Sequence, residues 1–243
     1  MRTSRTSSSS AGWPWPPSPL RLRRADSGVI SNLQRAVEVM DRLRSPGGCP
    51  WDAAQTHASL AKYLLEECYE VLEAIETNDL ELLREELGDL LLQVLFHARI
   101  TEELPPERAF SIEDVAADLV DKLVRRHPHV FAGAPAGDAD ALNETWERQK
   151  IAEKGRMSAT DGVPLGQPAL ALSAKLVARA ARDGLAVRPV RGEEFGERLF
   201  ALVREAVAAG VDPESALRAT TRSYRAAMIA AEQAADGTSA GAG

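Results

Sequence analysis

Glu66-Glu-Cys-Tyr-Glu70 and Glu86-Leu-Gly-Asp89 are two acidic stretches on either side of a turn signal at Asn78. Within each stretch, carboxylates at positions i and i+3 share one face of a helix. The acids of the two stretches are also placed symmetrically about Asn78. An antiparallel helical hairpin that turns at this residue would therefore bring four carboxylates together, with Glu67 facing Asp89 and Glu70 facing Glu86.

Apolar residues follow the same register as the acids. The symmetry about residue 78 pairs Leu60 with Phe96 and Leu64 with Leu92, as expected for two packed helices. The acids therefore lie on the buried stripe of the hairpin. Four carboxylates in a partly desolvated seam repel one another, so they take up protons or bind a cation. A ligand set made only of oxygen atoms selects a hard ion, Mg²⁺ or Mn²⁺.

Two other interpretations of the acidic stretches stay open at this point. Glutamates on helices most often form a solvated surface, and any one of these acids taken alone fits that description. The second alternative is a di-iron or di-manganese carboxylate bundle, which needs Glu-x-x-His on two helices. None of the histidines has a glutamate at position i−3, which disfavours redox di-metal chemistry; they are His57, His97, His127 and His129.

Helical periodicity extends over the whole chain from Val29 onward, because apolar residues recur at helical spacing and strand-like alternation is short. We therefore predict an all-α fold. Asn78 is expected to cap the third helix, and Ser111 with Asp114 to open the fourth. Asp212, followed by proline, is expected to cap the last. The expected helices span residues 29–44, 57–77, 79–104, 111–127, 140–153, 168–183, 193–209 and 213–235.

Charge and composition separate the first 28 residues from the rest of the chain. These residues carry five arginines and one aspartate beside serines and prolines, so we expect a disordered N-terminal extension. The remaining residues have a net charge of −11, which disfavours binding to a nucleic-acid phosphate backbone and favours attraction of metal cations. Two cysteines and the lack of a membrane-length apolar run favour a cytoplasmic protein without nucleic-acid or membrane partners.

The segment Gly48-Cys-Pro-Trp-Asp-x-x-Gln-Thr56 precedes the paired acids. The segment and the acids together form a more specific sequence pattern than the acids alone. Together, these motifs resemble the MazG-type nucleoside triphosphate pyrophosphohydrolases of the all-α NTP pyrophosphatase superfamily, over residues 30–155. The resemblance implies a helical bundle that hydrolyses NTP or dNTP to NMP and pyrophosphate with Mg²⁺, or with Mn²⁺ as a substitute, in nucleotide-pool house-cleaning. It also implies a role for Glu66 in positioning or deprotonating the attacking water, and it implies four metal ligands: Glu67, Glu70, Glu86 and Asp89.

Two further pairs of residues match the family pattern. Lys122 and Arg126 lie one turn apart near a helix C-terminus, where cations are favourable even without a ligand. Trp146 and Lys150 are also one turn apart, and a tryptophan at helical spacing is more often part of a core. The resemblance implies that the first pair contacts the triphosphate and that the second lies against the nucleotide.

The sequence after residue 155 predicts a second, incomplete module. Residues 156–168 are rich in glycine and proline and indicate a linker, and Glu194-Phe-Gly-Glu197 is similar to Glu86-Leu-Gly-Asp89. No Glu-Glu-x-x-Glu helix precedes this copy, so residues 169–236 form a C-terminal helical remnant. This remnant is either a degenerate second MazG-like module or a set of accessory helices.

The sequence thus predicts a pyrophosphohydrolase whose catalytic domain spans residues 29–155. We expect this domain to bury its remaining apolar surface in a homodimer, and we expect residues 237–243 to be a disordered tail. Two alternatives differ in function. One is a catalytically inert helical interaction protein, which the complete acid set argues against. The other is a sibling pyrophosphatase specialised for dUTP, dCTP or a phosphoribosyl nucleotide.

Overall fold

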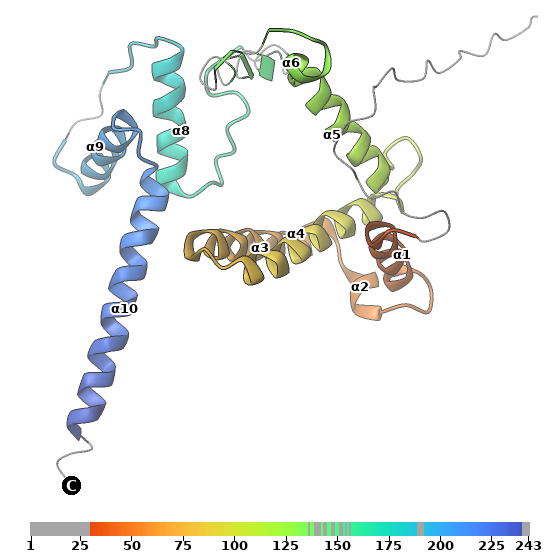
Figure 1. Cartoon of the computed structure of the whole chain (residues 1–243), viewed down its shortest axis with the longest axis horizontal. Helices are drawn as coiled ribbons and strands as arrows, with labels where there is room; N and C mark the ends of the chain where they lie inside the picture. The colour runs from red at the N-terminus through yellow and green to blue at the C-terminus, as the bar shows by residue number, and fades with distance from the viewer. Residues whose placement is uncertain are drawn as a thin grey trace, which may run out of the picture. The chain divides into compact units, whose positions relative to one another are not determined.

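The fold consists of helices joined by turns and loops. The computed structural model describes residues 30–135, 137–138, 142, 145–146, 149–150, 153, 155, 157–188 and 192–239. Within these residues every regular element is a helix (Figure 1), which confirms the all-α prediction. The helices are α1 (Asn32–Arg44), α2 (Pro50–Ala54), α3 (His57–Thr77), α4 (Leu80–Thr101), α5 (Ile112–Arg126), α6 (Pro128–Phe131), α8 (Ala169–Arg182), α9 (Phe195–Ala208) and α10 (Pro213–Ser239). None of these helices has the length and apolar character needed to cross a lipid bilayer.

The chain divides into two compact units, residues 1–118 and 119–243. This division lies inside α5 and differs from the boundary expected for the catalytic domain at residue 155, which stays a prediction. The expected N-terminal extension and part of the expected helix at 140–153 lie outside the described residues.

The antiparallel hairpin of α3 and α4 forms the centre of the first unit (Figure 1). Leu60 of α3 and Phe96 of α4 belong to one buried cluster, as the register about residue 78 predicts. Met40 of α1 joins the same cluster, so α1 packs against the hairpin. Burial of these apolar side chains fixes the register of the two long helices and thereby the relative positions of their acids.

The turn between α3 and α4 differs from the prediction in its capping residue. Asn78 has a φ of 57° and ends α3 in the left-handed conformation, which asparagine tolerates better than most residues. The neighbouring Asp79 caps α4, because its Oδ1 accepts hydrogen bonds from the backbone N–H groups of Glu81 and Leu82. The prediction of Asn78 as the N-cap is therefore wrong by one residue.

Other helix ends confirm some predictions and correct others. Ser111 and Asp114 are hydrogen-bonded to each other at the start of α5, and Asp212 accepts a hydrogen bond from Glu214 N–H at the start of α10. Helix α4 ends at Thr101, before the prolines, where the Thr101 hydroxyl donates to the Ala98 carbonyl. Helix α10 continues to Ser239, because one glycine costs a helix only about 1 kcal/mol. Residues 240–243 of the expected tail lie outside the described residues, and the tail stays a prediction.

Arg44 holds the loop that contains α2 against the hairpin. Its Nε and Nη2 donate to the Glu103 carboxylate at 3.0 and 2.9 Å, and its Nη1 donates to the backbone carbonyls of Asp52 and Gln55. The guanidinium also lies 5.5 Å from the centre of the Phe96 ring. Because the Arg44 side chain is buried, it needs all of these partners to offset the loss of hydration.

We expect Arg44→Ala to lower the free energy of unfolding by about 2–4 kcal/mol, because it removes a buried guanidinium that bonds to Glu103 and to the carbonyls of Asp52 and Gln55. Hydrogen bonds from Arg44 hold the pKa of Glu103 below its ordinary value of 4.5. This contribution to stability is fully present above that pH and is lost as the pH falls through the lowered pKa. The destabilisation should therefore shrink in denaturant titrations below pH 4.5.

Arg42→Ala is the matched control, since Arg42 is an exposed arginine in the same last turn of α1. Equal losses of stability for the two variants, or a loss that does not change with pH, would contradict this role for Arg44.

The second unit contains a similar arginine anchor. Arg179 of α8 is buried, and its Nη1 donates to the carbonyls of Ala159 and Asp161 at 2.8 and 2.9 Å. The segment predicted as a linker is therefore bonded to α8 within this unit. Val203 of α9 is also buried in the second unit.

Candidate metal and substrate site

Three carboxylates converge on the α3–α4 hairpin. Glu67 and Glu70 come from α3 and Glu86 comes from α4, and one oxygen of each lies within 4.8 Å of the others. Glu86 is only 9% exposed, Glu67 is half-buried and Glu70 is exposed. The three side chains come together as the symmetry about residue 78 predicts, but only Glu86 is buried, so the expected position of all the acids on the buried stripe is wrong for the exposed Glu70.

The other two predicted acids lie beside this group. Asp89 is half-buried, and its charge acts on both Glu67 and Glu86. Glu66 is exposed, and its charge acts on Glu67. The structure therefore brings all five acids into one electrostatic neighbourhood, with three of them in mutual contact range.

Burial and repulsion from neighbouring carboxylates favour the protonated forms of Glu67 and Glu86. Burial, a hydrogen bond with Glu70 and the charge of Asp89 raise the pKa of Glu67 above its ordinary value. Burial, followed by the charges of Glu70 and Asp89, raises the pKa of Glu86 in the same way. A divalent cation would relieve this repulsion, and an all-oxygen donor set fits a hard ion. The residues present therefore fit the metal that the sequence predicts.

The predicted phosphate-binding residues lie on the last turns of α5. Lys122 is exposed, whereas Arg126 is half-buried and forms an ion pair with Glu153, a residue that sequence analysis did not select. Arg125 pairs with the same carboxylate at 2.9 Å. Hydrogen bonds from Arg126 and then from Arg125 lower the pKa of Glu153 to about 2. Glu153 thus holds a negative charge against both guanidinium groups at neutral pH.

Trp146 lies next to this ion pair in the second unit. Its indole Nε1 donates to the backbone carbonyl of Arg126 at 2.9 Å, and its ring centre lies 5.0 Å from that of His127. Arg126, His129 and Trp146 also line a cavity of about 210 Å³. Lys150 follows Trp146 by four residues, has helical backbone conformation and is half-buried. The spacing in the sequence predicted the pair Lys122 and Arg126 and the pair Trp146 and Lys150, but it did not predict the contact between Trp146 and Arg126.

Two polar residues of α4 lie beyond the acids, and the sequence did not single out the first of them, Gln93. Gln93 follows Asp89 by one turn, and its buried Oε1 has no hydrogen-bond partner in the described part of the chain. His97 lies one turn further on, with its Nδ1 at 2.7 Å from that of His57. Burial and the neighbouring His57 lower the pKa of His97, which agrees with a structural histidine.

Comparisons with known proteins find relatives that are similar over most of the chain. The model of the MazG nucleotide pyrophosphohydrolase domain matches residues 55–131, which include the five acids, Lys122 and Arg126. The chain is 39% identical over 223 residues to the nucleoside triphosphate pyrophosphohydrolase/pyrophosphatase MazG of Thermotoga maritima, covering 82% of this chain and 84% of that protein. It is 44% identical over 209 residues to the nucleoside triphosphate pyrophosphohydrolase of Mycobacterium tuberculosis, covering 86% of this chain and 61% of that protein. An uncharacterised 26.1 kDa protein of Streptomyces cacaoi is 54% identical over 204 residues, or 83% of each chain.

Proposed function

The chain belongs to the MazG nucleotide pyrophosphohydrolase family and is a nucleoside triphosphate pyrophosphohydrolase. From this premise we propose which of its residues bind the metal, the water and the substrate. The observation that carries the proposal is the convergence of Glu67, Glu70 and Glu86 on the hairpin. The substrate is an NTP or dNTP of the cytoplasmic pool, and the products are NMP and pyrophosphate. The biological role is removal of unwanted nucleotides from that pool.

Glu67, Glu70, Glu86 and Asp89 hold a divalent cation, Mg²⁺ or in its place Mn²⁺. The all-oxygen donor set and the raised pKa values of Glu67 and Glu86 support this assignment. When bound, such an ion would neutralise charge that develops on the phosphate oxygens.

Glu66 orients the attacking water and accepts its proton. The position of this exposed carboxylate, whose charge acts on Glu67 of the ligand group, supports this role. The water oxygen bonds to the α-phosphorus, and the bond from that phosphorus to the bridging oxygen breaks. Pyrophosphate leaves with the electron pair of the broken bond.

Lys122 and Arg126 bind the triphosphate. A guanidinium and an ammonium supply the charge-assisted hydrogen bonds that phosphate oxygens accept. Because Arg126 is already paired with Glu153, the substrate must compete with this carboxylate for it. Trp146 and Lys150 lie against the nucleoside, and the contact of Trp146 with the Arg126 backbone supports a shared site.

We expect Glu153→Gln to lower the KM for NTPs about two- to fivefold at low salt, because it removes a charge that competes with phosphate. The kcat should change less than the KM. Steady-state kinetics at several salt concentrations measure both constants. Glu107→Gln is the control, since it removes an exposed acid of the first unit. A higher KM in Glu153→Gln than in this control would show that Glu153 supports binding instead.

A homodimer is the quaternary structure that we propose. Leu80, Leu87 and Val94 recur at heptad spacing on α4 and are 72%, 50% and 39% exposed. On α3, Leu65 and Tyr69 are exposed as well. A second copy of the hairpin would cover this apolar surface.

Product analysis in heavy-oxygen water tests the proposed reaction. The purified protein is incubated with a panel of NTPs and dNTPs and Mg²⁺, and the products are separated and weighed by mass spectrometry. We expect NMP carrying the heavy oxygen and unlabelled pyrophosphate. Orthophosphate as the direct product, or label in the pyrophosphate, would contradict attack at the α-phosphorus.

A further inference from the structure

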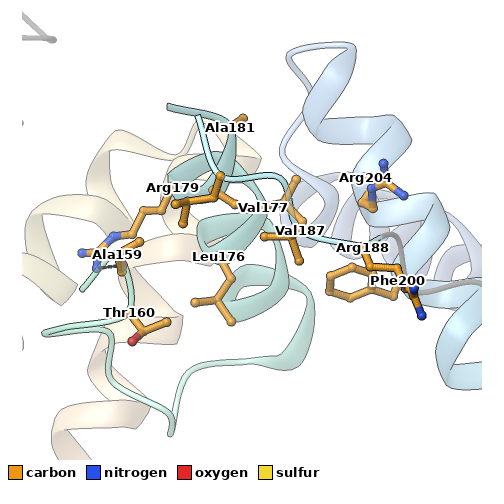
Figure 2. A pocket seen from close by; sticks show the side chains of 12 residues that line it. Ala159, Thr160, Leu176, Val177, Arg179, Ala181, Val187, Arg188, Phe200 and Arg204 are labelled. Atoms are coloured by element: carbon orange, nitrogen blue, oxygen red, sulfur yellow. Dashed lines mark hydrogen bonds between the residues drawn. The ribbon is translucent and has the colours of Figure 1, made fainter. Parts of the chain in front are cut away.

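A cavity of about 460 Å³ lies in the second unit between α8 and α9 (Figure 2), and none of the residues assigned to the reaction lines it. Its wall is mostly apolar, with Leu176 and Val177 from α8 and Phe200 from α9. Val187 of the connecting segment completes this apolar surface. The volume and the apolar lining are typical of a small-molecule site.

The charged lining of this cavity is entirely positive. Three arginines and no acidic residue line it, namely Arg179, Arg188 and Arg204. The Arg179 guanidinium is buried and donates to the Ala159 and Asp161 carbonyls, so it serves the fold. Arg188 and Arg204 are exposed, and neither forms an ion pair or hydrogen bond within the described residues.

The two exposed arginines lie on the α9 side of the cavity. Figure 2 shows Arg188 and Arg204 on the same side as the Phe200 ring, with their charged ends on different sides of that ring, and Leu176 and Val177 on the α8 side. An anionic group on the α9 side would receive charge-assisted hydrogen bonds from Arg204, and the charge of Arg188 would add to the favourable potential. The rest of the ligand would contact aromatic and aliphatic side chains.

We propose that this cavity binds a small organic anion that carries one carboxylate or phosphate on an apolar body. A nucleotide fits the lining poorly, because its sugar hydroxyls and base edges would face mostly aliphatic groups without partners. Among the twelve lining residues, only Thr160 offers a side-chain hydroxyl group as an uncharged hydrogen-bonding partner. The part of the chain that contains α8 and α9 therefore serves as a ligand-binding module, not as a second catalytic centre.

Calorimetric titration of the full chain with naphthoate and with its neutral analogue naphthamide tests the proposal. We expect naphthoate to bind at one site per chain and at least about tenfold more tightly than naphthamide, since only the acid pairs with the arginines. Arg204→Ala should abolish this preference. Val177→Trp should fill the cavity and abolish binding of both compounds.

Arg198→Ala is the matched control, because Arg198 is an exposed arginine of α9 outside the lining. It should bind naphthoate as the wild type does. If Val177→Trp does not fold, the double variant Arg188→Ala with Arg204→Ala tests the same claim through surface residues. Equal affinity for the acid and the amide, an unchanged preference in Arg204→Ala, or displacement of naphthoate by a nucleoside monophosphate would overturn the proposal.

Discussion

Glu86→Gln should lower kcat/KM for every nucleoside triphosphate by about a thousandfold or more, because it removes one charged ligand of the cation that we propose for this site. Glu86 is 9% exposed and its oxygen lies within 4.8 Å of those of Glu67 and Glu70. Glutamine keeps the shape of the side chain but not its charge. The metal-free variant should therefore melt at a higher temperature than the wild type, since one repelling charge is gone.

Glu73→Gln controls for the loss of an acid from the same hairpin, because Glu73 is exposed on α3 outside the carboxylate group. This variant should keep wild-type kinetics and the wild-type response to Mg²⁺. Wild-type turnover in Glu86→Gln at saturating Mg²⁺ would remove Glu86 from the metal site.

Arg126→Ala and Lys122→Ala should each lower kcat/KM about a hundredfold. The factor should be similar for all four bases, because we propose that both side chains bind the triphosphate, which every substrate carries. Trp146→Ala should instead change the ranking of the bases, with stacking worth about 1–3 kcal/mol. The comparison requires kcat/KM for four nucleotides in each variant.

Trp146→Phe distinguishes the stacking of residue 146 on the base from its contribution to the stability of the fold. It keeps an aromatic face but loses the hydrogen bond from Nε1 to the Arg126 carbonyl. We expect this variant to keep the base ranking of the wild type while losing stability. Base-selective losses in Arg126→Ala, with none in Trp146→Ala, would reverse the two roles.

The α3–α4 hairpin is the part of the fold that the sequence predicts best. Apolar periodicity and the symmetry of acids about residue 78 both depend on regular helix geometry, so the pairing of Leu60 with Phe96 follows from spacing alone. The same geometry explains why Glu67, Glu70 and Glu86 could be expected to converge.

Short elements and capping choices were harder to predict. Helices α2 and α6 are too short to show a periodic pattern, and each begins with a proline that the sequence equally associates with a turn. Asn78 and Asp79 are both good capping residues, so only the left-handed backbone of Asn78 decides which one caps α4.

Contacts between distant residues had no signature in the sequence. Glu153 pairs with Arg125 and Arg126 only because of tertiary packing in the second unit. The cavity between α8 and α9 likewise arises from the packing of two ordinary amphipathic helices. Neither feature has a motif, since neither depends on a fixed spacing along the chain.

Calorimetric titration of Mg²⁺ into the full chain tests the assignment of the carboxylate group most directly. We expect the wild type to bind Mg²⁺ without nucleotide, and Glu86→Gln to bind it at least about tenfold more weakly, with Glu73→Gln unchanged. Mg²⁺ affinity that is the same in all three proteins would contradict a metal site built from Glu67, Glu70, Glu86 and Asp89.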